Sequence, residues 1–316
     1  MKSKVFVDGQ EGTTGLKINE RLANREDLEI LRIAPEKRKD ASARRALLNE
    51  ADVVFLCLPD EAAREAVSLV TNEKTRVIDA STAHRTHPDW VYGLPELSGE
   101  QREKIQASRR VCVPGCHATG FTTILYPLVQ EGIVARDYPV TSYSVSGYSG
   151  GGKKLIAAYE EKEGRDERLK SPRLYALDLR HKHLPEMQKI NGLTHLPLFT
   201  PMVGDYYQGM VVGVPLTRRL LAKRLTAREV WEAMTAYYHG QRFIRVMPFA
   251  SQEYLDRGYL DATGCNHTNR VEIFVCGEGE QILLLARLDN LGKGASGAAV
   301  QNLNRMLGMD EGTGLV

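Results

Sequence analysis

The segment KVFVDGQEGTTGLKINERL, residues 4–22, decides the first half of the fold. It joins a short apolar run at 5–7 to three glycines with the spacing GxxGxxG and then to an amphipathic helical pattern. Glycines between a strand and a helix permit a tight turn and a close backbone approach, and the helix N-terminus then faces an anion. The segment therefore predicts a dinucleotide-binding loop, although the commoner spacing is GxGxxG. The expected cofactor residues in this loop are Gly9, Gly12, Thr13, Thr14 and Gly15.

The next expected strand, residues 28–34, indicates which dinucleotide binds. Its carboxyl end has no Asp or Glu, the residue with which an NAD site binds the ribose 2′-hydroxyl. Arg32 lies in this stretch and Arg38 follows it, and a basic site without a carboxylate suits a 2′-phosphate. We therefore expect NADP(H) rather than NAD(H). The alternative is that these cations only solvate an exposed loop.

Strands and helices alternate up to residue 116. Apolar runs at 51–59, 75–80 and 110–115 predict buried strands, and 60–70 predicts a helix that begins at or near Asp60. This alternation is typical of an α/β fold with a doubly wound, mostly parallel, Rossmann-like sheet, in which ligands lie beyond the carboxyl ends of the strands. Further cofactor contacts are expected at those ends, at Cys57, Leu58, Pro59 and Ser81.

The stretch VCVPGCHATG, residues 111–120, places Cys116 between a Pro-Gly turn and an expected helix. The helical spacing of apolar residues continues to a stop at Gly132. A thiol at a helix N-terminus faces unpaired N–H groups and the positive end of the helix dipole, and both favour the thiolate. Cys116 is therefore a candidate nucleophile. The alternative is a small buried apolar residue, as free cysteines often are.

Beyond about residue 135 the pattern becomes richer in strands. The stretches 138–150 and 210–217 alternate or are rich in β-branched residues, and a hairpin is expected around 277–279. Residues 226–240 predict a helix with Thr226 as its cap. We expect a second, α+β domain built on a mixed sheet, whose β-rich surface favours a homo-oligomer, a dimer or a tetramer.

The domain boundaries follow from this change of pattern. Residues 1–116 and 290–316 are expected to form the NADP-binding domain, because a small-residue turn near 290 leads into a final helix that returns to it. Residues 117–289 are expected to form the substrate and catalytic domain.

Composition excludes several classes of protein. The 316 residues carry a net charge of +2, which gives no electrostatic argument for a nucleic-acid or membrane partner. No apolar run approaches the roughly 18 residues of a membrane span. The five cysteines show neither paired nor metal-ligand spacing, so we expect reduced thiols and no metal. The sequence enters a strand at once without a signal-peptide pattern, so we expect a cytoplasmic protein.

Several segments together resemble the N-acetyl-gamma-glutamyl-phosphate reductase family, in its shorter form. The likeness covers essentially the whole chain, and no single motif carries it. The matching segments are the Gly9-Gly12-Gly15 loop, WVYGLPEL (90–97), PGCHATG (114–120), SGYSGGGKK (146–154), HKHLPEM (181–187) and DNLGKGASGAAVQ (289–301).

The resemblance implies a fold, a cofactor and a reaction. The family shares a two-domain fold with aspartate-semialdehyde and glyceraldehyde-3-phosphate dehydrogenases, uses NADP, and has a cysteine nucleophile. In this chain, Cys116 would attack an acyl phosphate, expel phosphate and form a thioester, whose reduction gives N-acetylglutamate 5-semialdehyde for arginine biosynthesis. The chain departs from the family's longer members at His117, where they usually have an aromatic residue.

An acid–base group is also needed, and histidine suits this role near neutral pH. By resemblance, HKHLPEM carries it: we favour His181 as the base, with His183 in contact with the substrate or with a residue that binds it. The alternative is that both are ordinary surface histidines. On an extended segment the two histidines share a face, and Pro185 favours an extended backbone before it. His117 ranks third, because neighbours at a helix start usually point apart.

Cations and backbone N–H groups are expected to bind the anionic substrate. Arg85 follows a strand end and can bind phosphate or carboxylate with its guanidinium fork. Lys153 and Arg180 are weaker candidates, and any of the three cations could instead be a solvated surface charge. Ser146, Gly147 and the glycines after them form either an anion-binding loop or a flexible turn. Asn290 is a nicotinamide contact by resemblance only.

Other functions remain open at this point. A cysteine hydrolase or acyltransferase would also use a Cys at a helix start and a distant His, but would not need the glycine loop. A non-catalytic NADP-binding protein would keep the loop without needing Cys116. A related acyl-phosphate reductase would keep the chemistry and act on aspartyl phosphate or on a longer acetylated amino-dicarboxylate phosphate.

Overall fold

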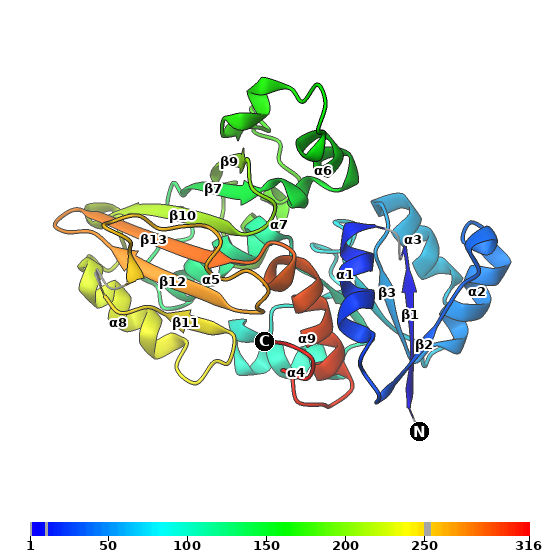
Figure 1. Ribbon diagram of the computed structural model, residues 1–316. Helices are drawn as coiled ribbons and strands as arrows, with labels where there is room; N and C mark the ends of the chain where they lie inside the picture. Colours follow the sequence, from blue (N-terminus) through cyan, green and yellow to red (C-terminus); the bar gives the residue numbers. More distant parts are fainter. Residues whose placement is uncertain (1, 10–11, 250–253) are drawn as a thin grey trace. The chain divides into compact units, whose positions relative to one another are not determined.

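The computed structural model describes residues 2–9, 12–249 and 254–316, and the chain divides into two compact units (Figure 1). The first unit comprises Met1–Gly115 and Ala295–Val316, and the second comprises Cys116–Gly294. Relative to the expected boundaries, Cys116 and residues 290–294 lie in the second unit, because Asn290 and Gly294 make close contacts there.

Within the described residues, the first unit is built on a six-stranded sheet whose neighbouring strands are all parallel. Across the sheet the order is β2-β1-β3-β4-β6-β5, so the chain moves from β1 outward to β2 on one side and to β3 and β4 on the other, with β6 inside the edge strand β5. This is the doubly wound, Rossmann-like arrangement predicted from the alternation of strands and helices. The strands are β1 (Ser3–Asp8), β2 (Leu28–Leu31), β3 (Val53–Leu56), β4 (Arg76–Asp79), β5 (Val91–Tyr92) and β6 (Arg110–Cys112).

The helices of the first unit form two packed groups. They are α1 (Thr13–Leu22), α2 (Ala41–Glu50), α3 (Asp60–Leu69), α4 (Gly99–Ala107) and α9 (Gly297–Met306), with short 3-10 turns η1 (Pro35–Lys37) and η2 (Pro95–Leu97). Helix α9 packs against α1 and α4, while α2 packs against α3. All four residues of β3 are buried, as expected for a strand covered on both faces.

In the described part of the second unit, the sheet has seven strands in the order β11-β12-β13-β10-β7-β9-β8. The pairs β7–β9 and β11–β12 are parallel and the other pairs are antiparallel, so the sheet is mixed, as predicted. The predicted hairpin is formed by β12 and β13. The strands are β7 (Thr141–Gly147), β8 (Arg173–Leu174), β9 (Leu198–Gly204), β10 (Met210–Thr217), β11 (Ile244–Val246), β12 (Val271–Cys276) and β13 (Gln281–Leu288).

Helix ends in the second unit follow the predicted signals. Helix α5 begins at Cys116 and ends two residues before Gly132, and Thr226 caps α8 in a reciprocal capping box with Glu229. The helices are α5 (Cys116–Gln130), α6 (Lys153–Glu160), α7 (Leu184–Asn191) and α8 (Ala227–Tyr237), with turns η3 (Tyr148–Gly151), η4 (Glu167–Lys170) and η5 (Arg218–Leu220) and the π-helical turn η7 (Gly292–Ser296). Among the described helices, none is long and apolar enough to cross a bilayer.

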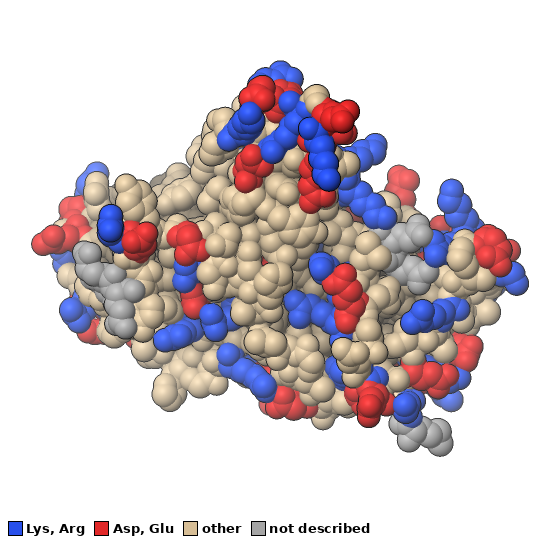
Figure 2. All heavy atoms as spheres, in the orientation of Figure 1, with Lys and Arg blue, Asp and Glu red and all other residues tan. Residues whose placement is uncertain are grey.

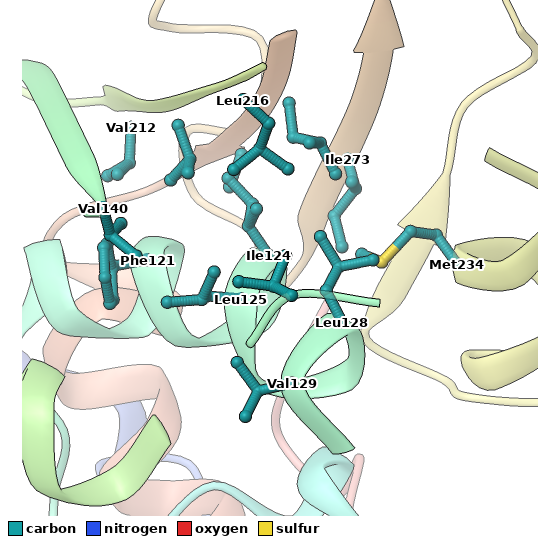
Figure 3. Close-up of a cluster of buried hydrophobic side chains, with 14 of the residues drawn as sticks. Phe121, Ile124, Leu125, Leu128, Val129, Val140, Val212, Leu216, Met234 and Ile273 are labelled. Carbon is teal, nitrogen blue, oxygen red and sulfur yellow. The ribbon is translucent and has the colours of Figure 1, made fainter. Parts of the chain in front are cut away.

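The core of the second unit lies between one face of the mixed sheet and helices α5 and α8 (Figure 3). Phe121, Ile124 and Leu128 of α5 pack in one cluster with Val212 of β10 and Ile273 of β12. Most residues of α5 are buried, so other parts of the protein pack against this helix on several of its sides. On the surface visible in Figure 2, basic and acidic side chains are interspersed, in keeping with the net charge of +2.

Candidate active site

The glycine loop after β1 leaves no room for a side chain at its first glycine. Gly9 has φ +88°, in the left-handed region, and a side-chain carbon there would lie 2.3 Å from the carbonyl oxygen of Cys57. Gly12 donates its N–H to the Gly9 carbonyl at 3.1 Å and directly precedes α1. Residues 10 and 11 lie outside the described residues. The N–H groups at the start of α1 suit a pyrophosphate, so the residues present fit a dinucleotide. The predicted residues in that first turn are Thr13, Thr14 and Gly15.

The other cofactor residues predicted at strand ends lie along the same edge of the first-unit sheet. Residues 57–59 connect β3 to α3, and Ser81 follows β4; β3 pairs with both β1 and β4. The buried carboxylate of Asp79 fixes Ser81 by accepting from its N–H at 2.9 Å and its hydroxyl at 2.7 Å. His84 Nδ1 lies 2.6 Å from the same carboxylate. The carboxyl edge is thus held by buried polar contacts.

Three arginines predicted for anion binding have different surroundings in the first unit. Arg32 follows β2 and is exposed, and Arg38 follows η1 and is half-buried. Arg85 donates from Nε to the Val113 carbonyl at 2.9 Å and from Nη2 to the Ala80 carbonyl at 3.3 Å. The guanidinium of Arg85 therefore ties together the loops that follow β4 and β6.

Cys116 is the first residue of α5 and is half-buried. The phenol of Tyr175 is close enough for a negative charge on Cys116 to act on it: burial first, and then that charge, raise the pKa of Tyr175 above its ordinary value. By contrast, burial raises the pKa of the Cys57 thiol well above its usual range, so Cys57 stays protonated. Of these two thiols, Cys116 remains the candidate nucleophile.

His117 joins three elements of the second unit. Its Nδ1 lies 2.9 Å from the hydroxyl of Ser144 on β7, and its Nε2 lies 2.9 Å from the hydroxyl of Tyr175, just after β8. Burial, followed by the charges of His181 and Lys182, lowers the pKa of His117 to about 3. His117 is therefore neutral at physiological pH and connects two hydroxyl groups.

The two histidines of HKHLPEM lie beside His117. The His117 ring centre is 5.3 Å from that of His181 and 5.5 Å from that of His183. His181 Nδ1 accepts from the backbone N–H of His183 at 3.1 Å, so a neutral His181 carries its proton on Nε2. The ring of His181 is half-buried and that of His183 is buried. From the sequence, His117 ranked third as a candidate base, behind His181 and His183. That prediction missed that the three imidazole rings form one cluster.

The prediction of an extended backbone through this motif was wrong. Helix α7 begins at Leu184, directly after His183, which has helical dihedral angles. Pro185 lies in the first turn of the helix, where a missing N–H leaves no bond unmade. The proline therefore marks a helix start here. The turn before it brings the ring centres of His181 and His183 to 4.7 Å from each other.

Ser146 and Gly147 are the last two residues of β7, and Gly147 donates its N–H to the carbonyl of Gly209, a residue that Asn290 also contacts. Both Ser146 and Gly147 are buried. Asn290 accepts the N–H of Gly209 at 2.7 Å and donates to the Ser149 hydroxyl at 3.0 Å. The side-chain amide of Asn290 thus joins the start of β10 to η3, and these bonds supply a structural role that the resemblance did not indicate.

Lys153 and Arg180 are not gathered with these buried groups. Lys153 is exposed at the start of α6, and Arg180 is exposed in the segment before α7. Among the residues that the structure describes, no group of three or more His, Cys, Asp or Glu side chains could hold a metal ion. Sequence reasoning missed Ser144, Tyr175 and Asp289. Only their contacts distinguish these residues from ordinary polar residues.

Comparison with known families gives two matches that cover most of the chain. Residues 4–106 match the NAD binding domain of semialdehyde dehydrogenases, and residues 116–290 match their dimerisation domain. Among solved structures, aspartate semialdehyde dehydrogenase II of Vibrio cholerae has a TM-score of 0.72 at 15% identity, covering 97% of this chain and 98% of that chain. The aspartate semialdehyde dehydrogenase of Francisella tularensis has a TM-score of 0.72 at 16% identity, covering 96% and 99%. At this identity the likeness shows the fold.

Relatives in sequence are closer. The N-acetyl-gamma-glutamyl-phosphate reductase 2 of Nostoc sp. is 50% identical over 99% of this chain and 99% of its own length. The N-acetyl-gamma-glutamyl-phosphate reductases of Burkholderia lata and Rhizobium meliloti are 47% and 46% identical, over 96% and 97% of this chain and 96% and 99% of their own lengths. The chain belongs to the N-acetyl-gamma-glutamyl-phosphate reductase family and has its nicotinamide-dinucleotide-binding domain.

Acid destabilisation is expected to depend on His117. Because its pKa falls from 6.5 to about 3 on folding, the unfolded chain binds the proton more readily than the folded one. Neutral His117 contributes its full share to the free energy of unfolding above pH 6.5, the pKa of histidine in the unfolded chain. As the pH falls from there toward 3, the free energy of unfolding decreases by about 1.4 kcal/mol per pH unit for this one proton. Urea titrations between about pH 7 and pH 4 should give a shallower loss for His117→Gln than for the wild type. Equal slopes would contradict the buried neutral imidazole.

Proposed function

We propose that this member of the N-acetyl-gamma-glutamyl-phosphate reductase family uses NADPH to reduce N-acetyl-L-glutamyl 5-phosphate to N-acetyl-L-glutamate 5-semialdehyde, with release of phosphate, in arginine biosynthesis. The observation that carries the proposal is Cys116 at the first residue of α5, whose second residue belongs to the histidine cluster. Relatives of about half-identical sequence bear the name of this activity over nearly the whole chain. Their names and the site chemistry agree.

Cys116 performs the first half of the reaction. Its thiolate attacks the acyl carbon, the bond from that carbon to the phosphate oxygen breaks, and inorganic phosphate leaves with the electron pair. The product is a thioester on Cys116. N–H groups at the start of α5 stabilise negative charge that develops on the acyl oxygen, because the first turn of a helix leaves them unpaired.

The histidine cluster handles the proton in the second half. NADPH, when bound, supplies the hydride that reduces the thioester. Cys116 then holds the acyl group as a thiohemiacetal; its hydroxyl proton is lost as the C–S bond breaks, which releases the semialdehyde and leaves the electron pair on the Cys116 thiolate. His181 is proposed as the acid–base group for that oxygen: the tautomer protonated on Nε2 donates a hydrogen bond to it, and the tautomer protonated on Nδ1 can accept its proton. His183 is proposed to contact the substrate.

Neutral His117 orients the phenol of Tyr175 beside Cys116. It bonds the Tyr175 hydroxyl through one ring nitrogen and is itself fixed by Ser144 through the other. Because burial keeps Tyr175 protonated, its hydroxyl remains a hydrogen-bond donor or acceptor near the thiol rather than a competing anion. Ser146, Gly147, Arg85, Lys153 and Arg180 remain candidates for binding the substrate's anionic groups.

The nucleophile test measures the reverse reaction, in which NADP, phosphate and N-acetylglutamate 5-semialdehyde give NADPH that is followed by its absorbance. Replacing the thiol in Cys116→Ala should lower kcat by at least about 10³-fold, because no thioester can form. Cys276→Ala, at a half-buried cysteine in β12, is the control and should retain activity. Unchanged turnover in Cys116→Ala would remove the mechanism.

The same assay separates the alternative functions. Aspartate semialdehyde and a longer acetylated semialdehyde, offered in parallel, should react more slowly than N-acetylglutamate 5-semialdehyde. A faster reaction with either would move the substrate assignment to that acyl phosphate. Absence of NADPH formation with every aldehyde would favour the non-catalytic dinucleotide-binding protein, and activity on ester substrates alone would favour the hydrolase.

NADP is the proposed cofactor, bound by the first unit. Arg32 and Arg38 follow the end of β2, the strand beside β1 and its glycine loop, and no carboxylate ends β2. Gly9, Gly12 and the first turn of α1 would receive the pyrophosphate, and residues 57–59 and Ser81 would line the carboxyl edge. Asn290 is the proposed contact to the nicotinamide amide, though its own amide already bonds two groups.

Cofactor preference is tested by two arginine variants. Arg32→Gln and Arg38→Gln should each raise the KM for NADP by about tenfold or more, the value of a hydrogen bond to a charged group, and leave the KM for NAD little changed. Arg219→Gln, at an exposed arginine of the second unit, is the matched control. Tighter binding of NAD than of NADP by the wild type would overturn the preference.

A homo-oligomer is the proposed assembly, formed by the sheet face turned away from α5. The pairing register places Tyr143, Gly213 and Leu285 in one row across β7, β10 and β13, and Pro215 and Leu283 in the next. Four of these side chains are apolar or aromatic and half-buried or exposed. The matched dimerisation domain includes all three strands. Residual apolar exposure of this kind is typical of surfaces that associate.

Sedimentation tests the assembly. The wild type should sediment as a dimer or tetramer, and a charge introduced by Leu285→Glu should shift it toward monomer, because a charge is costly to bury between two such faces. Leu220→Glu, at an exposed leucine in η5, is the control. A wild-type monomer at all concentrations would contradict the proposal.

The five cysteines are free thiols, which supports a reducing compartment, the cytoplasm, as the proposed location.

A further inference from the structure

The turn that follows β13 is organised by one buried carboxylate. Asp289 is fully buried, and its Oδ1 accepts from the N–H of Leu291 at 2.8 Å. Its Oδ2 accepts from the N–H of His267 at 2.8 Å and from Nε2 of Gln208 at 2.5 Å. A buried carboxylate is costly unless several donors satisfy it, as they do here. The carboxylate therefore fixes the turn to two other segments of the second unit.

The same turn has no space for side chains at two positions. A side-chain carbon on Gly292 would lie 2.3 Å from the Thr268 carbonyl oxygen. One on Gly294 would lie 2.7 Å from Cβ of Cys116 and 3.1 Å from the Asp289 carbonyl oxygen, which also accepts the Gly294 N–H at 2.9 Å. The backbone at Gly294 is therefore in direct contact with the start of α5, and it covers one side of Cys116.

Three further features of this region carry a conformational or desolvation cost. His267 has φ +66°, a left-handed conformation that is unusual for a residue with a side chain, and the N–H that it gives to Asp289 holds it there. The Lys293 side chain is fully buried, with its ammonium 5.6 Å from the centre of the Phe243 ring. Residues 292–296 are wound as a π-helix, a rare form that is frequent at functional sites. Costly local conformations persist where the surroundings over-determine them.

We infer that the Asp289 turn, residues 289–294, is a positioning element for the nucleophile: Asp289 fixes the turn, and Gly294 holds Cβ of Cys116 so that the thiol keeps one direction. Asp289 and Gly294 act through Cys116 and are positioning residues. The inference rests on the proposed role of Cys116 as nucleophile. It adds that the reactivity of the thiol depends on a segment far from Cys116 in sequence.

Gly294→Ala is the direct test. The added methyl group has to displace either the turn or Cys116, and a displacement of about 1 Å at a reacting group lowers kcat by roughly 100-fold. The KM for NADP should stay close to that of the wild type. The rate at which iodoacetamide alkylates Cys116, resolved by mass spectrometry and without substrate, should change at least several-fold. Gly99→Ala is the matched control, because a side-chain carbon there would meet nothing within 4 Å.

Asp289→Asn is the second variant and keeps the shape of the side chain. Its amide can no longer accept all three hydrogen bonds. The kcat and the rate of Cys116 alkylation should therefore change in the same direction as in Gly294→Ala, and by less. Thermal unfolding of each variant gives the folded fraction, by which kcat and the alkylation rate are corrected. Corrected values equal to the wild type in both variants would overturn the inference. If Cys116→Ala were active while Gly294→Ala still altered alkylation, the proposed function alone would fail.

Discussion

The packing of α5 against the mixed sheet is the constraint on which the site depends. Phe121, Ile124 and Leu128 bury their side chains in the cluster formed with β10, β12 and β13, and the same helix carries Cys116 at its first residue. Truncating one such aromatic side chain costs about 3–5 kcal/mol, so the helix cannot move without a large loss of stability. The thiol therefore lies on a packed helix rather than on a loop, as the proposed chemistry requires.

Local patterns in the sequence were sufficient for much of the fold. The glycine loop, the helix that begins at Cys116, the hairpin of β12 and β13 and the capped helix α8 each follow from spacing or from cap and turn residues within a few positions. The parallel sheet could be predicted because strand–helix alternation leaves few other arrangements. The same local pattern predicted a tight turn at Gly9. The structure adds that the backbone of Cys57 leaves no room there for a side chain.

The remainder of the site depends on contacts between distant residues, which no local pattern reports. His117 meets Ser144 and Tyr175 only because α5, β7 and the segment after β8 fold together. Pro185 was misleading because proline is compatible with both an extended segment and the first turn of a helix, and tertiary packing decides between them. Asp289 follows an apolar strand, where a capping or solvated carboxylate is the ordinary expectation, and only its buried donors show otherwise.

The discontinuity of the first unit has a consequence for biosynthesis on the ribosome. Strands β1 to β6 are translated first, but the helix that packs against α1 and α4 is α9, near the end of the chain. The nascent Rossmann-like sheet must therefore wait, with part of its apolar surface uncovered, while the whole second unit is translated. The inserted unit has no such dependence and can fold as soon as it emerges. Premature termination before α9 would leave a folded insert attached to an incomplete, aggregation-prone partner.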